Sequence, residues 1–293
     1  MRLPLCVCVC FCLIAGSFAF PARAATLPAP AVGVINKHDL FPGGFAVIAA
    51  IPAGPLPASD LLCEYRNILV PFFLLHDRQY AILPIPFSTP AGMLSVGITM
   101  DNTTIALIRA EIQQRPYKTT RLGPASPLPK HILERIEKER EATSAIFTAY
   151  NPAPRFTAPG GFTYPIGAAH ITDPYGTKRV RPNRTYYHAG VDFRARKPEK
   201  ILSIANGVVA YTGSHFIEGN LIIIDHGAGV YSCYMHLSKI KIKTGHGVQK
   251  GQLIAYSGKT GAAARGPHLH FLIKVHNIPV DPLAFIKIMN TLQ

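Results

Sequence analysis

Short apolar runs separated by turn residues fill the first half of the chain from residue 45 onward. Proline, glycine, asparagine and aspartate lie between the runs, and these residues are typical of tight turns. Strand-length runs at this spacing predict a small antiparallel β-sandwich or barrel over residues 25–112. Proline cannot donate to a strand ladder, so Pro71 and Pro84 are expected in edge or bulged strands. The runs are FAVIAAI (45–51), NILVPFFLL (67–75), QYAILPIPF (79–87), GMLSVGITM (92–100) and TTIALIRAEI (103–112).

A polar, proline-rich stretch at residues 113–129 interrupts this pattern and is predicted to be a linker. Residues 131–147 are mostly charged but carry a thin apolar stripe, which predicts an amphipathic helix. We expect this helix to cross between two domains, within a linking segment that spans residues 113–160. The apolar positions of the stripe are Ile132, Leu133, Ile136 and Ile146.

Strand-like runs return in residues 161–293, again divided by turn residues such as Asn206-Gly207 and His226-Gly227. The pattern predicts a second, compact antiparallel β-domain with hairpin connections. The expected fold class is therefore mainly β, with a small sandwich-like domain, a linking helix and a larger C-terminal domain. The C-terminal runs are ILSIANGVVAYT (201–212), NLIIIDHG (220–227), GVYSCYMHLS (229–238) and HLHFLIKV (268–275).

The first 24 residues resemble a secretory signal peptide. Arg2 precedes an apolar stretch from Leu3 to Phe20, and Ala22-Arg23-Ala24 fits a small-x-small cleavage site. An uncleaved membrane anchor is the alternative, because the apolar stretch is long. Cleavage would leave no membrane span and would place the protein in the periplasm or outside the cell.

Cleavage would also remove four of the six cysteines and leave Cys63 and Cys233. Two cysteines are too few for a disulfide-stapled fold. They could pair in an oxidising compartment, although we expect them in different domains. Two buried, apolar thiols are the alternative.

The chain is basic, with a formal charge of +14, or +12 after removal of Arg2 and Arg23. Such a charge favours anionic partners. Export argues against nucleic acid and for a polymer of the cell envelope. A basic cluster surrounds residues 187–192, and Arg194 within it is a candidate for binding substrate carboxylates. The cluster comprises Lys178, Arg179, Arg181, Arg184, Arg194, Arg196, Lys197 and Lys200.

Three segments with histidine are candidates for chemistry. In the first, His188 and Asp192 would stand about 13 Å apart on a straight strand, at about 3.3 Å per residue. That is too far for shared metal ligation, so the chain must bend near Gly190 if both bind one ion. In the second, strand alternation places His268 and His270 on one face and Leu269 on the other. Two surface histidines on one strand are the alternative.

The third segment is Ser232–Ser238. Alternation places Tyr234 and His236 on one face and Cys233 on the other. Cys233 should therefore not act with His236, which argues against a cysteine protease.

Together and in this order, the three segments resemble the lysostaphin-type (LytM-like) zinc endopeptidases of bacterial cell walls. The resemblance covers roughly residues 160–285 and includes the turn Ile171–Gly176 and the Val280-Asp281-Pro282 sequence. Residues 194–200 and 256–265 depart from the family pattern, which leaves the substrate preference open. The matching residues are His188 and Asp192, Tyr234-Met235-His236-Leu237-Ser238, and Gly266-Pro267-His268-Leu269-His270-Phe271.

The resemblance implies that His188, Asp192 and His270 hold one Zn²⁺ per chain in a groove of an antiparallel sheet. Two imidazoles and a carboxylate leave one position open, as in catalytic zinc sites. The resemblance further implies that His236 and His268 are catalytic and do not bind the metal. We expect His268 to deprotonate water and His236 to stabilise the oxyanion, or the reverse. Tyr234 is, with Arg194, a candidate for substrate binding.

The implied function is zinc-dependent hydrolysis of peptide cross-links in peptidoglycan during cell-wall remodelling. The alternative is a non-catalytic relative that binds murein or activates another hydrolase. The two-domain layout also suggests that the N-terminal domain shields the groove. The sequence leaves open both the oligomeric state and the bond that is cut, which could lie in a stem-peptide cross-link or in a glycine bridge.

Overall fold

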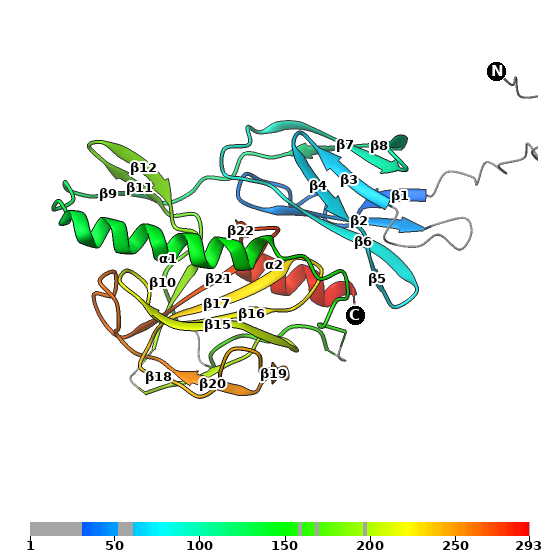
Figure 1. The fold of residues 1–293 in the computed structure, drawn as a ribbon. Helices are drawn as coiled ribbons and strands as arrows, with labels where there is room; N and C mark the ends of the chain where they lie inside the picture. Colours follow the sequence, from blue (N-terminus) through cyan, green and yellow to red (C-terminus); the bar gives the residue numbers. More distant parts are fainter. Residues whose placement is uncertain (1–30, 52–60, 158–159, 168–169, 196–197, 293) are drawn as a thin grey trace, which may run out of the picture.

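The computed structural model describes residues 31–292 except 52–60, 158–159, 168–169 and 196–197. The predicted signal peptide, residues 1–24, and the basic residues Arg196 and Lys197 lie outside this description. The fold is mainly β, as expected. An N-terminal sandwich is followed by a long helix and a larger sheet that forms the C-terminal half (Figure 1).

The N-terminal sandwich consists of two four-stranded antiparallel sheets that enclose a common apolar core. The first sheet has the order β1-β2-β6-β5, and the second has the order β4-β3-β7-β8. The strands are β1 (Ala31–Val34), β2 (Phe45–Ile51), β3 (Leu61–Tyr65), β4 (Ile68–Pro71), β5 (Phe73–Leu75), β6 (Arg78–Pro84), β7 (Gly92–Met100) and β8 (Thr103–Ile112).

The structure corrects some details of this region. The run NILVPFFLL forms two strands, β4 and β5, which belong to different sheets. Strand β3 was not among the predicted runs. Pro71 ends an edge strand, as expected, but Pro84 ends β6, which lies in the interior of its sheet. The ladder tolerates Pro84 because it is the terminal residue of the strand.

The C-terminal half is built on one large antiparallel sheet with the order β10-β13-β21-β17-β16-β15-β19, and β22 pairs with β21. Two small sheets, β14-β20-β18 and β12-β11-β9, flank it. Asp281 caps the last helix, α2, by accepting hydrogen bonds from the amides of Leu283 and Ala284. The elements are β10 (His170–Asp173), β11 (Lys178–Arg181), β12 (Arg184–Tyr187), β13 (Val191–Arg194), β14 (Lys200–Leu202), β15 (Gly207–His215), β16 (Gly219–Asp225), β17 (Val230–Leu237), β18 (Lys239–Ile240), β19 (Gly247–Val248), β20 (Leu253–Tyr256), β21 (His268–Val275), β22 (Ile278–Val280), α2 (Pro282–Met289) and a final 3₁₀ turn (Asn290–Leu292).

The long helix α1 (Lys130–Thr148) lies along one face of the large sheet (Figure 1). Phe147 packs there against a small apolar cluster that includes Tyr231 and Cys233. The expectation that this helix crosses between two domains was therefore wrong. Its thin apolar stripe fits a helix that covers a sheet face with few side chains.

The two remaining cysteines are buried and unpaired. Cys63 lies inside the sandwich core, and Cys233 lies beneath α1. They do not form the disulfide that we considered. Burial raises the pKa of each thiol to about 12, as expected for inert core cysteines.

The sandwich shares a hydrophobic core with the C-terminal half. In β2, Ala46 and Ile48 face the sandwich interior, whereas Phe45 and Val47 join the core of the C-terminal sheet. The ring centroids of Phe45 and Phe285 of α2 are 5.2 Å apart. Burial on both faces explains why residues 45–51 form a continuous apolar run instead of an alternating one.

Within the described ranges, neither α-helix combines the length and apolar content needed to cross a membrane. The linker prediction for residues 113–129 needs a correction, because β9 (Thr119–Arg121) pairs in parallel with β11 of the C-terminal half. This part of the linker is thereby fixed to the second half of the chain.

His226 makes the stability of the fold sensitive to acid. Its side chain is fully buried, with Nδ1 2.7 Å from the carbonyl of Asn206 and Nε2 2.7 Å from Oγ of Ser232. Burial lowers the pKa of His226 to about 4. Between pH 6.5 and 4, the unfolded chain therefore takes up a proton that the folded chain does not. The free energy of unfolding should therefore be highest above this pH window. Within the window it should decrease by up to about 1.4 kcal/mol for each pH unit of acidification.

Denaturant titrations at about pH 7.5 and pH 5 check this prediction. His226→Gln keeps hydrogen-bonding groups but does not titrate, so it should weaken the pH dependence by about one proton. The matched control is His131→Gln, at an exposed position of α1, which should leave the dependence unchanged. If the free energy of unfolding changes equally between the two pH values in the wild-type protein and in His226→Gln, the prediction is wrong.

Candidate metal centre and groove

Two of the predicted metal ligands face each other across neighbouring strands. Asp192 of β13 pairs with His270 of β21, so both side chains project from the same face of the sheet. Oδ1 of Asp192 lies 2.6 Å from Nδ1 of His270. The predicted alternation of β21 is confirmed, because Leu269 points into the core. The next pair on the same face of these two strands is Arg194 and His268.

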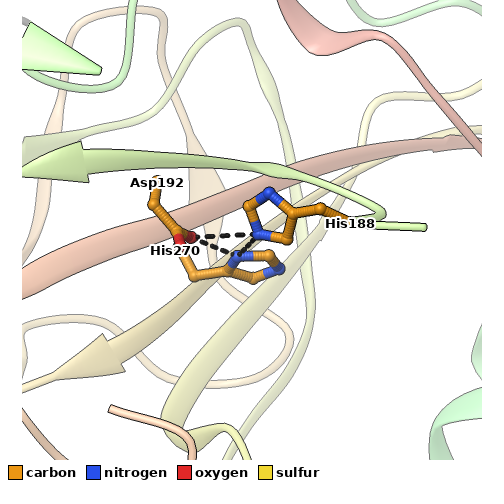
Figure 2. Close-up of side chains that lie close together, drawn as sticks. All are labelled: His188, Asp192 and His270. Carbon is orange, nitrogen blue, oxygen red and sulfur yellow. Dashed lines mark hydrogen bonds and ion pairs between the residues drawn. The ribbon is translucent and has the colours of Figure 1, made fainter. Parts of the chain in front are cut away.

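The third predicted ligand, His188, reaches this pair because the chain bends at Gly190, just before β13. Its Nε2 lies 3.1 Å from Nδ1 of His270 and 3.3 Å from Oδ1 of Asp192 (Figure 2). A Cβ atom at Gly190 would lie 2.5 Å from the carbonyl oxygen of Phe271 and 2.8 Å from Cε1 of His270. Only glycine therefore allows this close approach of the loop to β21. The expected bend at Gly190 is confirmed.

Backbone carbonyls fix the orientation of three histidines at the site. Nδ1 of His188 donates to Pro174, that of His236 donates to Thr260 and that of His268 donates to Gly266, at 3.1, 2.8 and 2.8 Å. A carbonyl only accepts, so Nδ1 carries the hydrogen in each ring. With the hydrogen on Nδ1, the Nε2 atom of a neutral ring is an acceptor, which suits either metal ligation or proton transfer.

His236 joins the other imidazoles by a route that strand alternation did not predict. The backbone of His236 has a φ of 61°, in the left-handed region that few residues other than glycine adopt. The regular alternation of β17 is therefore interrupted at this residue, and the imidazole turns to the side of the sheet that carries His268 and His270. The ring centroids of His236 and His268 are 4.6 Å apart, and those of His236 and His270 are 6.1 Å apart.

Tyr234 stays on the opposite side, so its predicted role in substrate binding needs correction. Its side chain is fully buried, and its hydroxyl accepts hydrogen bonds from the amide of Ile204 and the hydroxyl of Ser232. Tyr234 packs against Phe271, with ring centroids 5.3 Å apart. It therefore supports the site from within the core and does not face the groove.

The electrostatics of the three clustered side chains favour a bound cation. Burial opposes ionisation of Asp192, but the adjacent imidazoles of His188 and His270 outweigh it and hold the pKa of the carboxyl well below its usual range. Burial lowers the pKa of His270, and the nearby Asp192 only partly offsets this effect. A carboxylate thus stands beside a neutral imidazole, the protonation states that metal ligation requires.

The residues present fit a zinc ion. The potential ligand atoms of His188, Asp192 and His270 all lie within 4.8 Å of one another. Two imidazole nitrogens and one carboxylate oxygen are donors that Zn²⁺ accepts, and three protein ligands leave a position for a reactant. The carbonyl of Pro174 on the far nitrogen of His188 completes a typical arrangement around a metal-binding histidine.

The site opens into a groove of about 610 Å³. In the described part of the chain, no residue of the sandwich lines it. Thr120 and Leu122, from the segment around β9, form part of its wall instead. The expectation that the sandwich itself shields the groove is therefore not supported. The sequence did not predict that Thr260 supports the site. Its backbone carbonyl accepts a hydrogen bond from His236, and any residue type can supply a backbone carbonyl.

An aromatic cluster, Phe87 with Tyr117, Tyr175 and Tyr187, connects the sandwich to the loop that carries His188. The ring of Phe87 stacks on Tyr187 with centroids 4.4 Å apart and on Tyr175 with centroids 5.2 Å apart. Tyr187 directly precedes His188, and Tyr175 directly follows Pro174, which holds the far nitrogen of His188. The sandwich thereby supports the position of a metal ligand.

We expect Phe87→Ala to lower metal affinity about tenfold, because His188 would lose support on both sides. Titration of the metal-free protein with Zn²⁺ or Co²⁺ measures the effect. Ile98→Ala, in the sandwich core away from the aromatic cluster, controls for a general loss of stability. The prediction fails if the two variants bind metal equally well.

The fold and the site together define a metallopeptidase-type domain. Residues 186–282 match the model of peptidase family M23. Among curated relatives, this chain is similar to the peptidoglycan DD-endopeptidase ShyB of Vibrio cholerae. The two are 38% identical over 124 residues, which cover 41% of this chain and 29% of ShyB.

Lysostaphin of Staphylococcus staphylolyticus is 38% identical over 106 residues, which cover 34% of this chain and 22% of lysostaphin. The chain thus spans less than a third of the length of these two curated relatives. A crystal structure of an M23 peptidase from Pseudomonas aeruginosa is similar over 84% of this chain and 94% of that one. Its TM-score is 0.65 and its sequence identity is 27%. This likeness extends beyond the matched domain into the N-terminal half.

Proposed function

We propose that this protein is a zinc-dependent endopeptidase that hydrolyses peptide cross-links of bacterial peptidoglycan during cell-wall remodelling, in the periplasm or outside the cell. The convergence of His188, Asp192 and His270 on one point beside an open groove carries this proposal. The relatives named as peptidoglycan DD-endopeptidases support the choice of substrate. The complete ligand set speaks against the alternative of a non-catalytic, murein-binding relative.

His188, Asp192 and His270 would hold the zinc ion. When bound, the ion supplies Lewis acidity that activates water and polarises the carbonyl of the scissile peptide bond. The protein contributes fixed ligands and a groove that orients the peptide.

His268 and His236 would move the protons. Nε2 of His268 lies 3.9 Å from Oδ1 of Asp192, next to the ligand cluster, and is free to accept a proton from the attacking water. Burial lowers the pKa of His236 to about 4, although its hydrogen bond to Thr260 opposes this shift. Its Nε2 therefore begins as an acceptor. His236 can donate to the developing oxyanion only after it has taken up a proton.

Digestion of purified peptidoglycan tests the proposal. The zinc-loaded protein should release fragments in which a peptide cross-link has gained one water, as identified by mass. A chelator should stop the release, and added zinc should restore it. The proposal is overturned if the zinc-loaded protein leaves the cross-links intact.

A further inference from the structure

The groove beside the proposed zinc site is lined by more positive than negative side chains. Arg179, Arg181, Arg194 and Arg265 line it together with only two acids, Asp173 and Asp192. Arg179 forms an ion pair with Asp173, and Asp192 is held by the ligand histidines. The charges of Arg181, Arg194 and Arg265 are therefore left without a compensating carboxylate.

Arg194 is the closest of the three to the ligands along the sheet. It follows Asp192 by two residues on β13, which places its Cα about 7 Å from that of Asp192. It also pairs directly with His268 on β21. Arg265 lies on the loop that leads into His268. Both arginines are exposed, and neither forms an ion pair within the described ranges.

Arg181 adds a third positive charge from β11. Its Nη1 donates to the carbonyl of Gly123 at 2.5 Å, and its Nε is buried without a hydrogen-bond partner. The pKa of the nearby Tyr186 phenol responds to the same positive charges. Burial alone would raise the pKa of its phenol, but the hydrogen bond and charge of Arg181, with the charges of Arg179 and Arg184, lower it. An anion would thus meet the exposed guanidinium groups of Arg194 and Arg265 on this side of the groove, with the charge of Arg181 nearby.

We propose that Arg194 and Arg265, assisted by Arg181, bind a carboxylate carried by the substrate residue next to the scissile bond. This inference rests on the proposed function and narrows it. The preferred substrate is a cross-link peptide with a free carboxylate beside the cut, and a neutral glycine bridge is a poor substrate. Guanidinium groups bind carboxylates through paired, charge-assisted hydrogen bonds that an amide cannot replace.

Two synthetic cross-link peptides test the inference. They are identical except that the carboxylate beside the cleaved bond is free in one and amidated in the other, and a glycine-only peptide is the third substrate. The zinc-loaded protein should cleave the free acid with a kcat/KM at least about tenfold above that of the amide or of the glycine peptide. Arg194→Gln and Arg265→Gln should each reduce this ratio, and together they should bring it near one.

Arg109→Gln, at an exposed position of β8 in the sandwich, is the matched control for loss of one positive charge. It should leave the rate and the preference unchanged. Zinc content measured on every variant confirms that the metal site remains intact. Equal cleavage of the acid and the amide by the wild-type protein, or an unchanged preference in the double variant, would overturn the role of the arginines. Failure to cleave any of the three peptides with zinc bound would instead overturn the proposed function, and the inference with it.

Discussion

Replacement of His270 by alanine is expected to remove bound zinc and peptidoglycan hydrolysis together. His270 lies on β21 opposite Asp192, and its Nδ1 is within 3.1 Å of both other ligand side chains. Without it, two donors remain, which is too few for a tightly held catalytic ion. Lewis-acid activation contributes several kcal/mol to such reactions, so we expect the rate to fall by at least about a thousandfold. Elemental analysis and fragment release from purified peptidoglycan measure the two losses.

Asp192→Asn is the companion variant, because it keeps the shape of the side chain and removes its charge. His246→Ala is the matched control, since His246 is exposed and lies outside the groove. Circular dichroism on all three variants separates loss of metal from loss of fold. Continued hydrolysis by His270→Ala without bound zinc would refute the assignment of this residue.

Replacement of His268 or His236 should separate zinc binding from catalysis. Neither ring belongs to the ligand cluster, so each variant should keep about one zinc per chain. Loss of a positioned proton acceptor typically costs a factor of about 100 to 10,000 in rate. We therefore expect His268→Ala to bind zinc normally and to hydrolyse peptidoglycan at least about a hundredfold more slowly.

The variant at position 236 needs a residue that accepts the left-handed backbone, so His236→Asn is preferable to alanine there. Zinc content and fragment release are measured on the same samples. A loss of zinc in either variant would show that the replaced histidine is a ligand, and the assignment of roles would then be wrong.

The sequence predicted the parts of the site that depend on local rules. The alternation of His268 and Leu269 placed the histidines on the open face, and Gly190 identified where the chain must bend. The pairing of Asp192 with His270 could not be derived from spacing, because 78 residues separate them and sheet register depends on the whole fold. The resemblance to a known family supplied this convergence.

The errors have a common physical origin in tertiary structure. Strand alternation failed at His236 because contacts around the strand end, including the hydrogen bond from its amide to Glu218, hold a left-handed backbone. The helix over 131–147 was correctly expected, but its packing partner was not, because a thin apolar stripe does not specify which surface it covers. The pairing of β9 with β11 was missed because both strands are short and mostly polar, so neither forms an apolar run.

The double-sided burial of the sheet that contains β2 and β6 has a practical consequence for protein engineering. A fragment limited to residues 161–293 would present Phe285 and its neighbours to solvent, since Phe45 and Val47 cover them in the intact chain. Such a truncation would tend to aggregate unless these positions were redesigned with polar side chains. A shortened version of this protein should therefore retain the first sheet of the sandwich or carry a resurfaced α2.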